Sequence, residues 1–296
     1  MLANGNSSAS WSAAQHRLAR AIYLAAKAEA PYAPIDKPPG TGKFLMRSIP
    51  AQYLPISTRE TLLHSDVNEV LRARDGSKDL NRFTGQVKSM SGMVDIPASV
   101  RGGLYCSEDV FAQMAELYHY ADDNITRTRF GNANMSKVVT RRGFVTLQPL
   151  RELNIVNLTG ESVLSQRLFQ NLIASTEVQQ CLIACHYSDV LKAILDPNNN
   201  AAGRGLALGL ASNPGIEGIL VPSARDYETE AGGMSLMQTG NNVVLFVDDG
   251  KSAENMLRVV SVHLLNQSNG VQTISHYKPV STGGVFELTS TEPMPI

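Results

Sequence analysis

Residues 215–246 read GIEGILVPSARDYETEAGGMSLMQTGNNVVLF and contain two short apolar runs separated by a polar segment. The runs are GILVP (218–222) and NNVVLFVDD (241–249), and turn-forming residues flank both of them. Short apolar runs bounded in this way are typical of buried β-strands. We therefore expect two strands here, connected through the polar segment.

Strands and helices alternate irregularly on either side of this stretch. Apolar patterning predicts further strands at 44–49, 101–107, 143–150, 153–159, 258–265 and 285–290. Helical patterning predicts helices within 10–30, 107–123, 161–196 and 204–212. Because no regular β-α-β rhythm is present, the sequence favours the α+β class over a doubly wound parallel sheet.

The segment SEDVFAQMAELYHYADD (107–123) carries the clearest signals for the start of a helix. Ser107 is of the type that caps helix N-termini, and Glu108 and Asp109 suit the first turn, where the helix dipole favours negative charge. We expect a helix that begins at Ser107 and presents an apolar face.

The first 43 residues differ in composition from the remainder. An alanine-rich segment (10–30) is followed by PYAPIDKPPGTGK (31–43), which holds four prolines and two glycines. Such a segment is typical of a loop or linker. We therefore predict an N-terminal helical extension over 1–43 and a main domain over 44–296. Charged residues interrupt the N-terminal apolar stretch, so a signal peptide is not expected.

The overall composition restricts the class of protein. Of 296 residues, 43% are hydrophobic and 18% are charged, which fits a globular chain with a sizeable core. The formal net charge of -1 gives no electrostatic reason to expect nucleic acid or an anionic membrane as a partner. No apolar run reaches the roughly 18 residues of a membrane span, so none is expected.

Two local patterns suggest ligands but have simpler explanations. Cys181, Cys185 and His186 are spaced like metal ligands, yet no second ligand pair has suitable spacing, so we expect buried thiols and no metal. PPGTGK (38–43) resembles a phosphate-binding loop, but the first glycine of that motif falls at Lys37. We interpret this segment as a linker. Three cysteines in all argue for a reducing compartment rather than a disulfide scaffold.

Five segments, taken in order, resemble the motifs of the RES domain family. They are MRS (46–48), NRFTG (81–85), LYCSEDVFAQMAE (104–116), PLRELNIVNLTG (149–160) and the stretch 215–246 quoted above. The sequence departs from the family pattern at three positions, Met46, Asn81 and Thr84.

This resemblance implies both a fold and an activity. The fold is that of ADP-ribosyltransferases, with small packed sheets surrounded by helices. The activity is cleavage of NAD+ at the nicotinamide–ribose bond, with no metal and no cofactor besides the substrate. Depletion of NAD+ implies a toxin that acts in the bacterial cytoplasm and is restrained by a cognate antitoxin or immunity protein.

Breaking this glycosidic bond passes through an oxocarbenium-like transition state, which a nearby carboxylate stabilises. The resemblance gives this role to Glu116, with Glu108 as the rival carboxylate, and makes Tyr105 an aromatic platform for a ring. A solvated helix residue is the simpler explanation for Glu116, and a core tyrosine for Tyr105.

The pyrophosphate of NAD+ requires cations, and the resemblance assigns them to Arg47, Arg82 and, more weakly, Arg225. The planar guanidinium offers two parallel charge-assisted hydrogen bonds to phosphate oxygens. Ser223, at the end of a predicted strand, is assigned to ribose or phosphate. Surface salt bridges would explain the arginines equally well, and a turn would explain the serine.

Several alternatives stay open on sequence alone. The acceptor is water in a glycohydrolase and phosphate in a phosphorylase, whereas a protein side chain would make the chain an ADP-ribosyltransferase. The altered NRFTG loop also allows a catalytically inactive NAD-binding module. The sequence leaves open a homo-oligomer and export by a route that needs no signal peptide.

Overall fold

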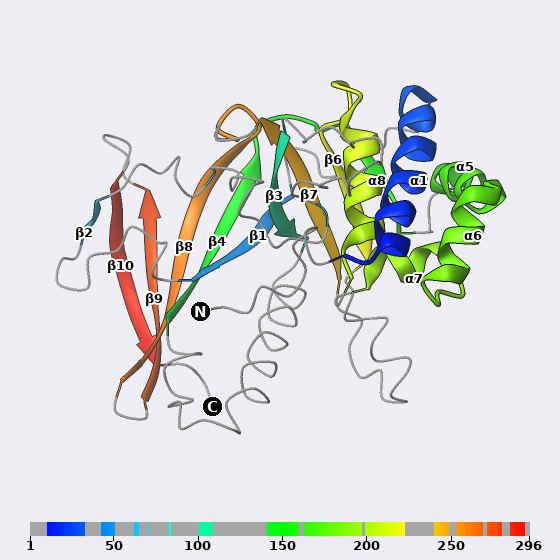
Figure 1. Ribbon diagram of the computed structural model, residues 1–296. Coiled ribbons are helices and arrows are strands. Elements are labelled where there is room, and N and C mark those ends of the chain that lie inside the picture. Colours follow the sequence, from blue (N-terminus) through cyan, green and yellow to red (C-terminus); the bar gives the residue numbers. More distant parts are fainter. Residues whose placement is uncertain are drawn as a thin grey trace, which may run out of the picture. The chain divides into compact units, whose positions relative to one another are not determined.

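The computed structural model describes residues 11–32, 43–50, 62–64, 71, 83, 101–108, 141–159, 163–196, 199–222, 240–248, 253–268, 271–279 and 285–293. Its described residues form a mixed α+β protein (Figure 1). The chain divides into two compact units. Unit 1 comprises Met1–Pro38, Ala73–Tyr105 and Leu153–Lys251, and unit 2 comprises Pro39–Arg72, Cys106–Glu152 and Ser252–Ile296. The predicted α+β class is confirmed at this level.

Unit 1 contains all the described helices, and α1 lies alongside α8 (Figure 1). The helices are α1 (Ala13–Glu29), the 3-10 turn η2 (Ala30–Tyr32), α5 (Val163–Ala174), α6 (Thr176–Ala184), α7 (Val190–Leu195) and α8 (Ala201–Ala211). Its strands are β5 (Ile155–Asn157), β6 (Gly218–Pro222), β7 (Asn241–Asp248) and the first part of β3 (Arg101–Ser107), which ends in unit 2.

A capping box fixes the start of α1. The Ser12 hydroxyl accepts a hydrogen bond from the backbone N–H of Gln15 at 3.2 Å, and the backbone N–H of Ser12 donates to Gln15 Oε1 at 2.6 Å. These bonds satisfy two of the backbone donors that a helix N-terminus leaves unpaired. Leu18 and Ile22 are then fully buried on the inner face of the helix. The helix predicted within 10–30 is therefore confirmed, and its inner face contributes to the core of unit 1.

Helices α1 and α8 approach each other closely enough to require glycine. A Cβ atom added at Gly205 would lie 2.3 Å from the carbonyl oxygen of Ala19, and one at Gly209 would lie 2.6 Å from the Cβ of Ala26. Real Cβ atoms do not approach backbone oxygens this closely, so no other residue fits Gly205 without moving a helix. The two glycines are four residues apart and therefore lie on the same face of α8.

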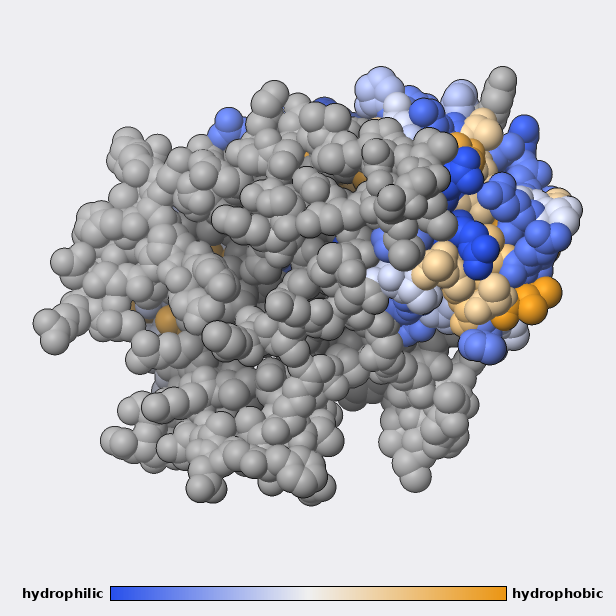
Figure 2. Space-filling view, viewed as in Figure 1, coloured by the Kyte–Doolittle hydropathy of each residue, from blue (hydrophilic) through white to orange (hydrophobic). Residues whose placement is uncertain are grey.

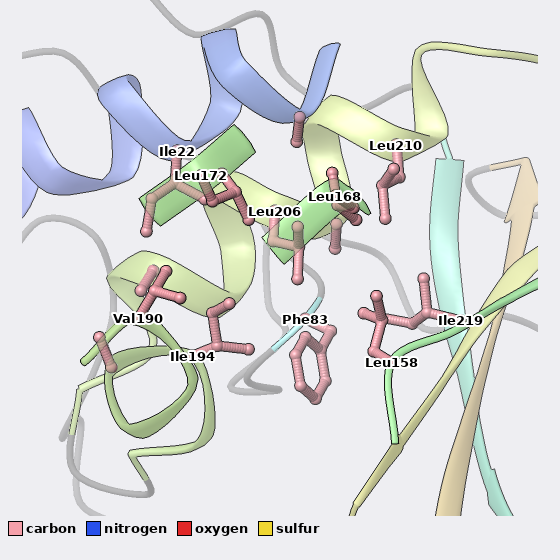
Figure 3. Close-up of a cluster of buried hydrophobic side chains, with 14 of the residues drawn as sticks. Ile22, Phe83, Leu158, Leu168, Leu172, Val190, Ile194, Leu206, Leu210 and Ile219 are labelled. Carbon is pink, nitrogen blue, oxygen red and sulfur yellow. The ribbon is translucent and has the colours of Figure 1, made fainter. Parts of the chain in front are cut away.

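The core of unit 1 lies between the helices and the sheet. We call it the unit 1 core cluster; it combines buried apolar residues of α1 and α5–α8 with residues of β5, β6 and β7. Figure 3 shows the helical side chains Ile22, Leu172 and Leu206 turned toward the same interior as Leu158 and Ile219. Burial of this apolar surface is the main stabilising contribution to the unit.

Unit 2 is built from antiparallel strands. They are β1 (Leu45–Pro50), β2 (Leu62–His64), β4 (Arg141–Pro149), β8 (Leu257–Ser268), β9 (Val271–Pro279) and β10 (Val285–Pro293). Hydrogen bonding joins them in the order β2-β10-β9-β8-β4-β1, and the last residue of β3 pairs with β1 through Ser107 and Met46. Figure 1 shows β4, β8 and β10 as long, twisted arrows and β2 as a short one.

One face of this sheet is apolar and buried. Val145, Val262 and Tyr277 are cross-strand neighbours on β4, β8 and β9, and each is at most 7% exposed. Side chains directly opposite each other in an antiparallel pair share a face. The side chains of the residues next to these along each strand, including His263 and His276, therefore point to the other face of the sheet.

The helix predicted over 107–123 lies outside the described residues beyond Glu108. Ser107, its expected N-cap, is a buried residue at the end of β3. In the described part of the chain, no helix has the length and apolar character needed to cross a membrane.

The helical face of unit 1 seen in Figure 2 is mainly hydrophilic, with some hydrophobic residues among the polar ones. The large apolar side chains exposed on the described helices include Ile183 at 71% and Ile173 at 52%. Single exposed apolar residues are normal on protein surfaces and need no functional explanation.

Candidate functional site

Polar residues gather where β5 and β6 end and β7 begins. Strands β5 and β6 are parallel, and Asn157 pairs with Leu220; β6 and β7 are antiparallel, and Pro222 pairs with Asn241. The carboxyl ends of β5 and β6 therefore meet the start of β7 at one edge of the sheet in unit 1. The carboxyl edge of parallel strands is a common position for ligand sites in α/β proteins.

Asparagines dominate this edge. The Oδ1 atom of Asn157 accepts hydrogen bonds from the backbone N–H of Thr159 at 2.9 Å and from its hydroxyl at 2.8 Å, which turns the chain directly after β5. Asn242 is fully buried on β7, opposite Val221 of the unit 1 core cluster. A buried amide on an otherwise apolar face needs hydrogen-bond partners, and Asn242 has them.

Tyr105 contributes from β3, which neighbours β7 in the sheet. It is half-buried and packs against the unit 1 core cluster. The aromatic ring thus contacts apolar residues, and part of the side chain stays accessible. This location fits an ordinary core tyrosine, and it also fits a tyrosine whose ring supports a substrate at the boundary of the core.

Phe83 is the described residue of the NRFTG segment, and it is a core residue. It is 2% exposed and belongs to the unit 1 core cluster. Figure 3 shows its ring turned toward the same interior as Leu158 and Ile219, which come from the segments that contain β5 and β6. The aromatic side chain therefore anchors the NRFTG segment at Phe83.

Arg47 lies in unit 2, on the buried face of the sheet. It sits on β1 opposite the fully buried Val145 and is only 8% exposed. Its charge reaches Cys106: burial raises the pKa of that thiol to about 12, and the nearby guanidinium partly opposes the rise. Because the side chain is buried, the surface salt bridge considered as the simpler explanation for Arg47 is excluded. Arg47 has interactions within the protein.

The other predicted site residues fall outside the described residues: Arg82, Glu116, Ser223 and Arg225. The rival carboxylate, Glu108, is half-buried directly after β3. Tyr105 and Arg47 belong to different units, and each is described within its own.

A buried polar group that the sequence analysis missed lies on α8. Arg204 is 2% exposed, and its guanidinium lies 5.7 Å from the centre of the Trp11 ring. The Trp11 indole N–H donates to Asn200 Oδ1 at 3.1 Å, and the edge of His16 faces the same ring at a centroid distance of 5.4 Å. The sequence feature that could have indicated this buried group is an arginine in the apolar run RGLALGLAS. Every position next to it on α8 is buried. This group fastens the start of α1 to α8.

Cys181 lies on α6, and Cys185 and His186 directly follow the helix. Burial raises the pKa of both thiols. His186 is exposed and ends the helix with a φ of 63°. Among the described residues, no group of three or more His, Cys, Asp or Glu side chains is placed to hold a metal ion.

Comparison with known proteins gives no family assignment: no protein-family model matches the sequence, and no curated protein matches it.

Proposed function

We propose that this protein cleaves NAD+ at the nicotinamide–ribose bond, with water or inorganic phosphate as the acceptor. The observation that supports the proposal is the convergence of the segments that resemble RES motifs. Phe83, Leu158 and Phe246 come from three of these segments, far apart in the sequence, and all are members of the unit 1 core cluster. Tyr105, from a fourth segment, packs against the same cluster.

This convergence has a chemical consequence for the proposed site. Arg82 precedes Phe83, and Ser223 follows Pro222 at the carboxyl end of β6, so both lie next to anchored positions in the sequence. In the proposed reaction Tyr105 supports a ring of the substrate, and Asn242 holds the polar end of β7 in place.

The proposed reaction develops positive charge on the ribose as the bond to nicotinamide lengthens. The resemblance assigns Glu116 to stabilise this charge and to orient the attacking group, and it assigns Arg82 and Arg47 to the pyrophosphate.

Consumption of NAD+ would make the protein a toxin in the bacterial cytoplasm, and a toxin of this kind requires a neutralising partner. We propose an antitoxin or immunity protein that covers the active site. Transfer of ADP-ribose to a protein side chain would instead put labelled ADP-ribose on a macromolecule, and an inactive module would bind NAD+ without releasing nicotinamide.

Arg47→Lys is expected to lower the rate of nicotinamide release from NAD+ about ten- to hundredfold. The replacement keeps the charge but removes the paired hydrogen bonds of the guanidinium, and a hydrogen bond to a charged group contributes about 1.5–3 kcal/mol. The rate is measured with purified protein at saturating and at limiting NAD+, with and without phosphate.

The matched control for this experiment is Arg258→Lys. Arg258 is an exposed arginine of unit 2 whose Nε donates to Gln148 Oε1 at 2.8 Å, and it has no place in the proposed reaction. Its replacement should leave the rate unchanged. Equal rates for Arg47→Lys and the unmodified protein, with both folded by circular dichroism, would remove Arg47 from the proposed site.

A further inference from the structure

Three side chains on unit 2 form a continuous hydrogen-bonded chain. The hydroxyl of Ser261 lies 2.9 Å from Nε2 of His263, and Nδ1 of His263 lies 2.7 Å from Nδ1 of His276. Ser261 and His263 are two residues apart on β8, so their side chains leave the same face of the strand. His276 is the direct cross-strand neighbour of His263 on β9, and the two rings meet edge to face at 4.8 Å.

The direction of each hydrogen bond depends on the tautomer of each imidazole ring. If the Ser261 hydroxyl donates to Nε2 of His263, the proton of that ring is on Nδ1 and is donated to His276. His276 then accepts at Nδ1 and carries its own proton on Nε2. Burial, together with the neighbouring His276, lowers the pKa of His263, so its ring is neutral at pH 7 and able to accept the serine proton.

The hydrogen-bonded side chains lie on one face of the sheet. Val262, between Ser261 and His263, is fully buried on the opposite face, and Tyr277, beside His276, is 7% exposed there. Ser261, His263 and His276 are each half-buried. None of the three residues is fully enclosed in the core.

The backbone beside the serine is irregular. On β4 and β8, Thr146 pairs with Ser261 and Leu147 pairs with Val259, so Val260 is an extra residue without a partner on β4. The ladder between β8 and β9 begins only at Val262. Bulges of this type leave backbone groups outside the regular ladder and are enriched next to active sites. The backbone N–H groups at this bulge are candidate donors to the oxyanion that develops when a serine attacks an acyl carbon.

We propose that Ser261, His263 and His276 form a second active site that hydrolyses small acyl esters. A nucleophile within hydrogen-bonding distance of a base, which is itself oriented by a third group, is the arrangement that activates serine in hydrolases. The site is independent of the proposed NAD+ reaction, because it uses no residue assigned to that reaction.

The reaction proceeds in two balanced steps. Ser261 Oγ attacks the acyl carbon while its proton passes to Nε2 of His263; the bond to the leaving alcohol then breaks, and the alcohol oxygen takes that proton. Water next loses a proton to Nε2 and attacks the acyl carbon, the bond to Oγ breaks, and Oγ regains the proton. His276 holds the Nδ1–H of His263 throughout and is the positioning residue.

The test is covalent labelling with a fluorophosphonate probe, followed by mass spectrometry to locate the modified residue, together with hydrolysis of p-nitrophenyl acetate. The full-length protein should be labelled at Ser261, and Ser261→Ala should abolish both labelling and serine-dependent hydrolysis. His263→Ala should also abolish labelling. His276→Ala should slow labelling about tenfold or more and change its pH profile, because the third group of such a triad sets the orientation and tautomer of the base.

Ser275→Ala is the matched control. Ser275 precedes His276 on β9, so its side chain leaves the opposite face of the strand, and its hydroxyl lies 3.2 Å from Thr291 Oγ1. Its replacement should leave labelling unchanged. Absence of labelling in the folded, unmodified protein would overturn the proposal, as would labelling that persists in Ser261→Ala. If His263→Ala fails to fold, the location of the label and the Ser261→Ala result still decide the question.

Discussion

Phe83→Ala is expected to lower the free energy of unfolding by about 3–5 kcal/mol, the usual cost of removing a buried aromatic side chain. Phe83 is 2% exposed in the unit 1 core cluster, and alanine would leave a cavity there (Figure 3). A loss of this size is a large fraction of the roughly 5–15 kcal/mol that stabilises an ordinary domain. Urea denaturation followed by circular dichroism measures it.

Phe44→Ala supplies the comparison for Phe83. Phe44 is 50% exposed, so its removal should change the free energy of unfolding by no more than about 0.5 kcal/mol. The proposal also makes a prediction for Phe83→Leu, which keeps most of the apolar volume. This variant should lower the rate of NAD+ cleavage strongly while it lowers the free energy of unfolding only slightly, because Arg82 is adjacent to Phe83 in the sequence. Equal stability of Phe83→Ala and Phe44→Ala would show that the NRFTG segment is not anchored in the core.

Gly205→Leu is expected to prevent the packing of α1 against α8 and to leave unit 1 unfolded or severely destabilised. Even the first atom of the new side chain would lie 2.3 Å from the carbonyl oxygen of Ala19, so one helix must move. The smaller change Gly205→Ala tests whether the free energy of unfolding rises or falls. Helix propensity alone predicts a gain of about 1 kcal/mol for alanine, whereas overpacking predicts a net loss of about 1–3 kcal/mol.

Gly215→Ala is the control for the glycine series. Gly215 is exposed, and the nearest atom to an added Cβ is the side-chain oxygen of Asn213 at 3.2 Å, which can move aside. Its replacement should change the melting temperature little. A Gly205→Ala protein that is more stable than the parent would contradict the close approach of α1 and α8.

The sequence predicted those elements whose own residues carry the signal. Strands such as β6 and β7 are continuous apolar runs, and they were located to within a few residues. Strand β9 was missed because VQTISHYKP has few apolar residues. The polar residue Ser275 occupies one of its buried positions, so the alternation of apolar and polar residues typical of a strand is not visible in the sequence. Strand β2, only three residues long, was also missed.

Tertiary contacts that are distant in sequence explain the other differences. The segment 10–30 was correctly predicted to be helical, but nothing in it shows that Ala19 and Ala26 face glycines of α8 almost two hundred residues later. The two compact units are each assembled from three separate parts of the chain, an arrangement that no local pattern specifies.

Tyr105 and Arg47 were assigned to the candidate site from their motifs, and that assignment stays a prediction. The structure describes the surroundings of both residues. The burial of Arg47 could not be inferred from MRS, because burial depends on its cross-strand neighbours. The Ser261, His263 and His276 chain was also missed, since it requires the register of β8 against β9, which no local pattern specifies.

The most direct test of NAD+ cleavage is the release of nicotinamide by the purified protein beside its Glu116→Gln variant. Loss of a general acid–base or electrostatic carboxylate typically lowers the rate about 10²–10⁴-fold, while glutamine preserves the size of the side chain. The proposal predicts nicotinamide release that falls by at least about a hundredfold in the variant, with phosphate dependence separating a phosphorylase from a glycohydrolase. No release from NAD+ by the folded protein, with or without phosphate, or equal release by the two proteins, would contradict it.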